Sequence, residues 1–377
     1  MGREQGRLGR VKVIEVTNTD FALRQFLLPL MRAGRKRGHE MIGIAPDGPL
    51  LRGVEAEGFR VIAHPFVRRV SPATHLASFR LLLETFRRER PDVVHAHMPI
   101  SGFLARAAAR AAGVPRVAYT CHGFLFRPPA RWPLRAGTLA MEWLGGRLTD
   151  VYLTVSEADA ALARRLAIFP RAEAIGNGRD GAIFRPDAAA RVRIRAGFGT
   201  PAERVVVLIV SRLVRPKGYP ELIEAMRALP EAELWVVGER LPSDRGTDLT
   251  PLFDASGLGS RLKLLGYRED VPAILAAADI FALPSHFEGL PMVLIEAMLT
   301  GLPVVASDIP GPREQVMPGV SGLLVPRADA AALAAALASL AEAPERRAAM
   351  GKAGRERALS RYDEANVLAR TLDRLGL

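Results

Sequence analysis

Short apolar runs alternate with amphipathic stretches through the first half of the chain. Stretches with a helical pattern lie at about 21–37, 50–57 and 101–112. The apolar runs have the length of single strands and lie at 11–17, 41–46, 59–64, 91–97, 117–122 and 151–155. Strands that alternate with helices predict a parallel sheet, and ligands bind such sheets at the carboxyl ends of the strands.

A second alternation follows a break. The segments 176–180 and 184–187 are rich in glycine, proline, asparagine and aspartate, which is typical of turns and linkers. Beyond them, strand-like runs lie at 204–210, 234–238, 262–266, 280–283, 304–306 and 322–325. The pattern predicts two α/β domains, 1–188 and 189–377, with a ligand site in the cleft between them. An alanine-rich helix at 328–343 and a last helix at about 362–375 close the chain.

Composition narrows the class of protein. The 377 residues suffice for two domains, and the single cysteine excludes a disulfide framework and a cysteine-based metal site. One cysteine also fits a reducing compartment. No apolar stretch of signal-peptide length precedes Asp20, and no run of eighteen apolar residues occurs. We therefore expect a cytoplasmic protein with no membrane-spanning segment.

The positive charge is distributed unevenly. The chain has 52 Lys and Arg against 40 Asp and Glu, and the whole excess lies in residues 1–190, which hold 29 basic and 17 acidic residues. Only five of the basic residues are lysine, as in any arginine-rich composition, but such a bias would affect both halves alike. The asymmetry predicts that the first half meets an anionic partner, such as a membrane surface, a lipid diphosphate or nucleic acid.

Two carboxylates, Glu288 and Glu296, follow the predicted strand 280–283. The pattern predicts a loop with a helix that begins at Glu288 and places Glu296 about two turns further, roughly 12 Å along the axis. The free N–H groups at a helix amino end attract phosphate. Carboxylates on either side of such a phosphate site suit a nucleotide-sugar, which has hydroxyls at both ends and a diphosphate between them. Alternatively, the two glutamates are ordinary helix charges.

Two cations, Arg212 and Lys217, share the loop after the predicted strand 204–210. A guanidinium and an ammonium fixed at this edge of a sheet can neutralise a diphosphate. They would stabilise the charge of a leaving nucleoside diphosphate without a metal ion. By itself, such a cluster is more often a solvated basic loop.

Together these motifs resemble retaining family 4 glycosyltransferases, which have the GT-B fold of two Rossmann-like domains. The resemblance rests on Glu-x7-Glu between D-I-F-A-L-P-S and G-L-P-V-V-A-S, and on S-R-L-V-R-P-K-G. It implies that Glu288 is catalytic and contacts the donor sugar, while Glu296 holds the nucleotide ribose. The turn L-G-Y-R-E-D-V is similar to a family turn that meets the base. The implied donor-binding residues are Arg212, Lys217, Arg268, Phe287, Gly289, Leu290 and Glu296.

A histidine before glycine, His122, ends the predicted strand 117–122. The sequence Y-T-C-H-G-F-L-F resembles an H-G-F-x-F subgroup of the family, whose acceptors are commonly sugars on polyprenyl diphosphate. This resemblance implies that His122 is catalytic and contacts a sugar hydroxyl or the reaction centre, although a lone histidine is more often structural. Cys121 is interpreted as a small buried residue without a chemical role.

The loop after the first strand departs from the family pattern. Many members carry two glycines there, whereas residues 17–24 contain none. Thr19 and Arg24 are the candidates for acceptor binding in this loop. His95 and His97 stand near the end of the strand 91–97, and they either line the acceptor site or only pack.

Two segments, 67–90 and 124–147, mix arginine with leucine, phenylalanine and tryptophan. In the second, Arg127, Arg131 and Arg135 stand near Phe124 and Trp132. Cations suit lipid head groups and aromatic rings suit the acyl boundary, so the pattern favours an interfacial segment. The alternative is an amphipathic helix packed on its own sheet. The charge asymmetry favours a peripheral protein on the inner face of the cell membrane.

The resemblance implies a retaining transfer of a hexose or N-acetylhexosamine from a UDP-sugar to a lipid-diphosphate-linked sugar. The last helix, about 362–377, is expected to cross back to the first domain. No metal cofactor is expected, because neither D-x-D nor a histidine cluster is evident. A UDP-sugar 2-epimerase shares the architecture, but its acid and base residues are not identifiable here. A basic nucleic-acid-binding protein lacks a reader module or stacking platform, so no nucleic-acid partner is expected.

Overall fold

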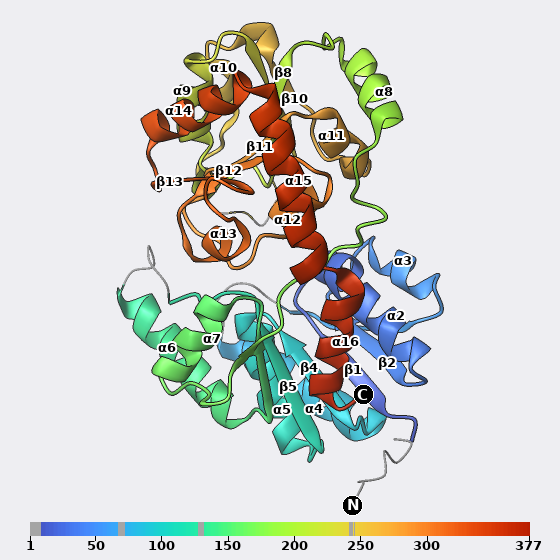
Figure 1. The fold of residues 1–377 in the computed structure, drawn as a ribbon. Helices are drawn as coiled ribbons and strands as arrows, with labels where there is room; N and C mark the ends of the chain where they lie inside the picture. Colours follow the sequence, from blue (N-terminus) through green and yellow to red (C-terminus); the bar gives the residue numbers. More distant parts are fainter. Residues whose placement is uncertain (1–8, 67–71, 127–131, 241–243, 245) are drawn as a thin grey trace, which may run out of the picture. The chain divides into compact units, whose positions relative to one another are not determined.

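A computed structural model describes residues 9–66, 72–126, 132–240, 244 and 246–377. The chain divides into two compact units, Met1–Gly176 with Asn366–Leu377 and Asn177–Ala365. In each unit a parallel β-sheet is flanked by helices (Figure 1). The predicted α/β class, with one parallel sheet in each half of the chain, is therefore confirmed.

The first unit contains a seven-stranded sheet in the order β3-β2-β1-β4-β5-β6-β7. Its strands are β1 Lys12–Val16, β2 Glu40–Ala45, β3 Arg60–Ala63, β4 Val93–His97, β5 Arg116–Cys121, β6 Val151–Thr154 and β7 Glu173–Ala174. Its helices are α1 Asp20–Ala22, the π-helical turn η1 Leu23–Leu27, α2 Leu28–Lys36, α3 Leu51–Glu55, α4 Pro72–Glu89, α5 Pro99–Ala111, α6 Trp132–Arg147 and α7 Glu157–Arg165. The two-residue strand β7 was not predicted.

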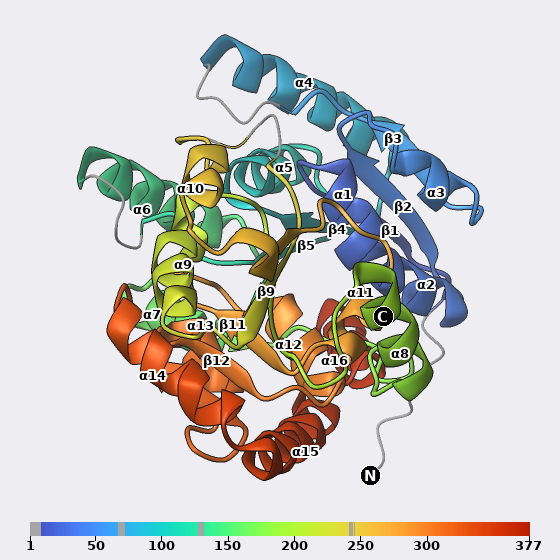
Figure 2. The same ribbon diagram turned by 90° about the horizontal axis from the view of Figure 1, so that it is seen from above.

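The last helix, α16 Glu364–Leu375, contributes to the core of the first unit. Leu372 and Leu375 are buried with Leu28 and Met31 of α2 on one side of the sheet. The other side is covered by a second apolar cluster from β1, β4, β5, α4 and α5, and α4 lies beside α5 (Figure 2). Apolar clusters on both sides explain why the central strands are almost continuously buried.

The second unit contains a six-stranded sheet in the order β10-β9-β8-β11-β12-β13. Its strands are β8 Val205–Val210, β9 Ala232–Val237, β10 Leu262–Leu264, β11 Ile280–Leu283, β12 Val304–Ser307 and β13 Gly322–Val325. Its helices are α8 Ala188–Phe198, the 3₁₀ turn η2 Arg215–Lys217, α9 Tyr219–Arg227, α10 Thr250–Asp254, the 3₁₀ turn η3 Gly259–Arg261, α11 Val271–Ala277, α12 Met292–Leu299, α13 Pro310–Gln315, α14 Ala330–Ala341 and α15 Pro344–Arg361. Helices α9 and α14 lie side by side (Figures 1 and 2).

The two units divide between Gly176 and Asn177, upstream of the boundary expected at 188. Contacts explain this position, because Asn177 and Arg179 already bond to α12 and the loop before it. Helix α15 was not predicted, and its residues are mainly charged or small, so the apolar pattern gives only a weak signal there.

Among the described residues, no helix combines the length and the apolar character needed to cross a membrane. Ligands of parallel sheets gather at the carboxyl ends of the strands. These ends carry the candidate site residues in both units.

Candidate active site

The loop between β11 and α12 carries Glu288. β11 ends at Leu283 and α12 begins only at Met292, so Glu288 lies within the loop. Pro291 is the N-cap residue with an extended backbone, and proline also disfavours the helical conformation of the residue before it. The prediction that the helix begins at Glu288, two turns before Glu296, is therefore wrong.

Two loops of the second unit meet beside Glu288. The backbone N–H of His286 donates to the carbonyl oxygen of Pro216 at 2.8 Å. Lys217 Nζ donates to Glu288 Oε1 at 2.5 Å, and both side chains are largely buried. His286 Nε2 also lies 2.9 Å from Glu221 Oε1 on α9. The structure thus brings together a predicted cation and a predicted carboxylate that lie on different strand-to-helix loops.

Two glycines allow the backbone to approach closely around these loops. Gly218 has φ +77°, and a Cβ there would lie 2.0 Å from the carbonyl oxygen of Pro284. At Gly311, the first turn of α13, a Cβ would lie 2.1 Å from the carbonyl oxygen of Gly289. Any larger residue at either position would displace the loop that holds Glu288.

Glu296 is buried and paired. Its Oε1 accepts a hydrogen bond from Arg179 Nε at 2.6 Å. The neighbouring Asn177 donates through Nδ2 to the carbonyl oxygen of Leu290 at 2.7 Å, and Leu290 is itself buried. The first residues of the second unit therefore hold both the loop residue Leu290 and the helix residue Glu296 of the Glu-x7-Glu stretch. The sequence indicated only turns and a linker there, so this role of Asn177 and Arg179 was missed.

The other predicted donor-binding side chains are Arg212 on the loop after β8, Phe287 beside Glu288, and Arg268 on the loop after β10. Arg212 is half exposed and forms an ion pair with Asp244. Arg268 makes two hydrogen bonds to Asp270, at 2.8 and 2.7 Å, and these bonds lower the pKa of that carboxyl below its usual range. Phe287 is 50% exposed, so part of its side chain is accessible to a ligand. Phe287 is thus accessible to solvent, whereas each of the two arginines is paired with a carboxylate that a phosphate could replace.

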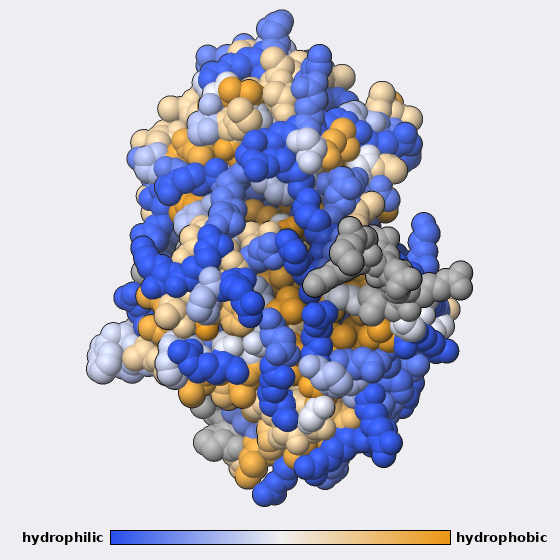
Figure 3. Space-filling model, turned by 60° about the horizontal axis from the view of Figure 1, so that its bottom comes forward, coloured by the Kyte–Doolittle hydropathy of each residue, from blue (hydrophilic) through white to orange (hydrophobic). Residues whose placement is uncertain are grey.

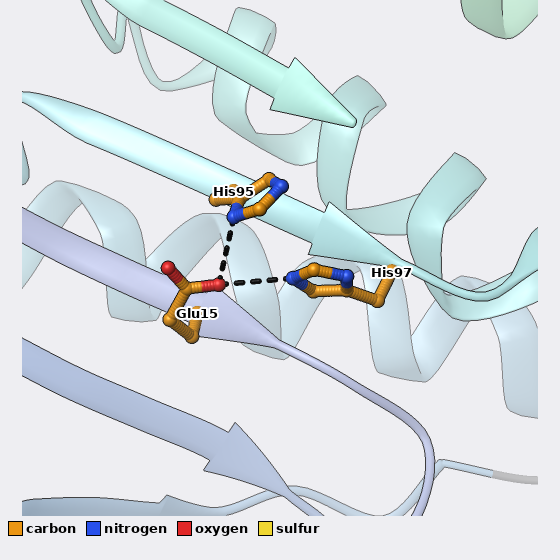
Figure 4. A group of neighbouring side chains, drawn as sticks. All are labelled: Glu15, His95 and His97. Atoms are coloured by element: carbon orange, nitrogen blue, oxygen red, sulfur yellow. Dashed lines mark hydrogen bonds and ion pairs between the residues drawn. The ribbon is translucent and has the colours of Figure 1, made fainter. Parts of the chain in front are cut away.

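In the first unit, buried polar side chains of β1 and β4 meet one another (Figure 4), and their hydrogen bonds continue to His122 beyond the end of β5. Glu15 of β1 is in register with His95 of β4, and β5 ends one residue before His122. His97 Nε2 donates to Glu15 Oε2 at 2.9 Å, and His97 Nδ1 lies 3.1 Å from His122 Nε2. His95 Nδ1 lies 2.9 Å from the same Glu15 oxygen but makes no well-aligned hydrogen bond, while its Nε2 bonds Thr120 at 2.8 Å.

The protonation states of this cluster follow from its burial and its contacts. Burial acts to raise the pKa of Glu15, but the imidazoles of His95 and His97 outweigh it and lower that pKa to about 2. Burial and the neighbouring His95 lower the pKa of His97 to about 4. Burial, His97 and His95 lower the pKa of His122 to about 3. Near neutral pH, Glu15 is therefore a carboxylate, whereas His97 and His122 are uncharged.

Glu15 and the cluster around it were not predicted from the sequence. Donor atoms of Glu15, His95 and His97 lie within 4.8 Å of one another and could hold a metal ion. The statement that no histidine cluster exists is thus corrected, while the expectation that no metal is required stays a prediction. A charged residue inside the apolar run 11–17 was the available signal, since an unpaired buried carboxylate is costly.

The two candidates in the loop after β1 have local roles. Thr19 is the N-cap of α1, and its hydroxyl accepts a hydrogen bond from the N–H of Ala22 at 3.0 Å. Arg24 is partly buried in the π-helical turn η1 and lies against Gly53 of α3. A capped helix start replaces the family's glycine loop here, so their role in acceptor binding stays a prediction.

Comparisons with known proteins define the class. The family described as glycosyl transferases group 1 matches residues 190–357, and Glycosyltransferase Family 4 matches residues 25–182. A UDP-Gal:alpha-D-GlcNAc-diphosphoundecaprenol alpha-1,3-galactosyltransferase from Escherichia coli is 30% identical over 74% of each chain. A GDP-mannose-dependent alpha-(1-6)-phosphatidylinositol monomannoside mannosyltransferase from Mycolicibacterium smegmatis is 31% identical over 86% of this chain and 87% of its own.

The chain belongs to the group 1 glycosyltransferases and is a glycosyltransferase enzyme. Solved structures agree on the fold. HepE from Anabaena with UDP and glucose superimposes with a TM-score of 0.84 at 22% identity, over 97% of this chain and 100% of that one. WaaG, a glycosyltransferase of lipopolysaccharide biosynthesis, gives 0.75 at 18% identity over 96% and 99%. The predicted GT-B fold is confirmed. Membership of this family also favours glycosyl transfer over epimerisation as the activity.

Proposed function

We propose that this enzyme transfers a hexose or N-acetylhexosamine from a UDP-sugar to a lipid-diphosphate-linked sugar with retention of configuration. The observation that carries the donor part is the Lys217–Glu288 pair, held on two adjoining loops of the second unit. The acceptor part is supported by the Escherichia coli relative, whose name gives GlcNAc on diphosphoundecaprenol as its acceptor.

The donor diphosphate would take the place of acidic side chains. Lys217 and Arg212 are each paired with a carboxylate, Glu288 and Asp244 respectively. Phosphate oxygens are equally good acceptors for both cations, and the two phosphates together offer one negative charge to each cation. Binding of the diphosphate would release Glu288 to accept hydrogen bonds from hydroxyls of the donor sugar. Backbone groups near Arg268 would meet the base.

The chemical step requires no separate catalytic base in this proposal. The bond between the anomeric carbon and the diphosphate oxygen breaks, and the acceptor oxygen bonds to the same face of that carbon. The acceptor proton goes to the leaving phosphate oxygen, so atoms and charge balance. Lys217 and Arg212 would stabilise the charge that develops on the leaving group. His122, uncharged near neutral pH, would act through hydrogen bonds to the sugar.

Nucleotide titration tests the donor part. We expect calorimetry to show selective binding of UDP over GDP and ADP, with the same affinity with and without magnesium. Selective binding of GDP would redirect the donor to a GDP-sugar, as in the name of the mycobacterial relative. Failure to bind any of the three would contradict the proposal.

Replacing Glu296 by alanine should weaken UDP binding by about 1–3 kcal/mol, because the ribose hydroxyls would lose their acceptor. The same calorimetry measures this loss. Glu233→Ala is the matched control, since Glu233 is also buried and lies 3.7 Å from a cation, Lys263, in the same unit. An unchanged UDP affinity in Glu296→Ala would remove the ribose role.

The acceptor lipid requires access to a membrane surface, and α6 has the corresponding side chains. Trp132, Leu134, Trp143 and Leu144 are exposed, with Trp132 at 77%. The guanidinium of Arg147 lies 3.3 Å from the ring centre of Trp143. Arg127 and Arg131, which the sequence assigned to this interfacial segment, lie outside the described residues. The exposed rings and cations support a peripheral association with anionic lipid.

A pocket of about 450 Å³ opens between α6 and α7 in the first unit. Apolar side chains and two cations line it: Phe126, Arg135, Ala136, Leu139, Leu162, Arg165 and Leu166. An apolar chain that ends in a diphosphate has complementary chemistry. On the face of the molecule shown in Figure 3, hydrophobic side chains form small groups among hydrophilic ones.

Sedimentation with vesicles tests the membrane part. At low salt, we expect binding to vesicles with anionic lipid, little binding to neutral vesicles, and weaker binding as salt screens the charges. Trp132→Ala with Leu134→Ala should release much of the bound protein. Val192→Ala, a change at a 72% exposed residue of the second unit, should not. Binding that is indifferent to lipid charge would count against the membrane association.

A further inference from the structure

His122 hydrogen-bonds to the buried His97 through one of its two ring nitrogens, Nε2. Its Nε2 lies 3.1 Å from His97 Nδ1, and His97 Nε2 lies 2.9 Å from Glu15 Oε2. Glu15 and His97 are almost fully inaccessible to solvent, whereas His122 is partly exposed. Within the part of the chain that the structure describes, His122 Nδ1 has no hydrogen-bond partner. Nδ1 is therefore the ring nitrogen that a ligand could reach.

The direction of each hydrogen bond follows from the carboxylate. Glu15, when ionised, only accepts, so His97 carries its proton on Nε2. A neutral imidazole has one donor and one acceptor, which makes His97 Nδ1 an acceptor. His122 must then donate from Nε2, and its Nδ1 is left with a lone pair. A protonated His97 would instead donate to His122 and place the His122 proton on Nδ1.

The distances favour hydrogen bonds over metal ligation. In a tetrahedral site with metal–nitrogen bonds of about 2.0–2.1 Å, neighbouring ligand atoms lie about 3.3 Å apart. Both contacts of Glu15 Oε2, to His95 Nδ1 and to His97 Nε2, measure 2.9 Å. In addition, His97 Nε2 is aligned for donation to the carboxylate, which directs a proton and not a lone pair toward it.

We propose that Glu15 and His97 are positioning residues that hold His122 in the Nε2–H tautomer, so that His122 presents Nδ1 as a hydrogen-bond acceptor. The ligand group that it recognises is then a hydroxyl donor, and within the proposed function this is a sugar hydroxyl. That consequence for turnover rests on the proposed function, whereas the tautomer does not.

The tautomer can be measured without any substrate. In protein labelled with ¹⁵N-histidine, protonated and unprotonated ring nitrogens give well-separated signals, and the loss of signals in His122→Gln identifies those of His122. We expect His122 to be protonated on Nε2 alone near neutral pH. In Glu15→Gln, the amide can either accept from or donate to His97, so we expect both tautomers of His122. Detection of the Nδ1–H tautomer in the unmodified protein would overturn the proposal.

Transferase kinetics provide the second measurement. Once an accepted sugar is identified, Glu15→Gln and His97→Gln should lower kcat about 10- to 100-fold while leaving the Kd of UDP unchanged. His64→Gln is the matched control, because His64 is equally buried in the same unit but bonds Ser78 at 2.6 Å. If kcat falls equally in His64→Gln and His97→Gln, the role of His97 is only structural and the proposal is contradicted.

Metal analysis distinguishes the remaining alternative. Protein purified without chelators should contain no stoichiometric transition metal. One bound ion that is lost in Glu15→Gln would make these side chains ligands and would overturn the positioning role. If UDP fails to bind while the Nε2–H tautomer is observed, the proposed function fails and this inference stands.

Discussion

Replacing Lys217 by alanine should lower turnover by about 100- to 1,000-fold, because the leaving diphosphate would lose a fixed positive charge in the transition state. The change also leaves Glu288 unpaired and largely buried, which should cost about 1–2 kcal/mol of folding stability. Initial-rate measurements with the accepted donor, together with thermal unfolding, separate these two effects.

Lys263→Ala is the appropriate control for Lys217→Ala. The side chain of Lys263 is 21% exposed against 19% for Lys217, and it too lies near a buried glutamate of the second unit. The Lys263→Ala variant should unfold more easily than the unmodified enzyme but turn over at the same rate. A double change, Lys217→Ala with Glu288→Gln, should recover stability without recovering the rate. Recovery of the rate would show that Lys217 serves only to neutralise Glu288.

Local sequence pattern was sufficient for the elements that carry the site, because each is coded within a few residues. The buried strands β8 and β11 are continuous apolar runs, and a polar residue follows the first and a proline the second. The helix start was misjudged because the carboxylate spacing was given more weight than Pro291. Proline at a helix start is a local signal, so the sequence itself contains the evidence for the later start of α12.

Contacts between distant segments could not be predicted in the same way. Arg179 and Glu296 are 117 positions apart, and nothing in either neighbourhood specifies the other. Glu15 and His97 pair because β1 and β4 are adjacent in the sheet, which is a property of strand order. A single sequence gives the strands but not their order. The cluster around His122 therefore became visible only in three dimensions.

Gly218→Ala is expected to have the largest effect on stability, about 3–5 kcal/mol. The residue has φ +77°, which is unfavourable for alanine, and the new Cβ would lie 2.0 Å from the carbonyl oxygen of Pro284. Gly199→Ala separates the two causes. Gly199 also has a positive φ, +64°, but a Cβ there meets nothing within 4 Å, so only the backbone cost of about 1 kcal/mol applies.

Gly218→Ala should also affect turnover, because the segments next to Gly218 position Lys217 and Glu288. Relief of the collision must move either the end of β11 or the turn that carries Lys217, and the bond from His286 to Pro216 joins these segments. A shift of about 1 Å at this junction would separate Lys217 from Glu288 and lower turnover by about 100-fold. Thermal unfolding and initial rates of both glycine variants measure the two effects. If Gly199→Ala loses as much stability as Gly218→Ala, backbone conformation alone accounts for the loss, and the close approach of the two loops has no energetic role.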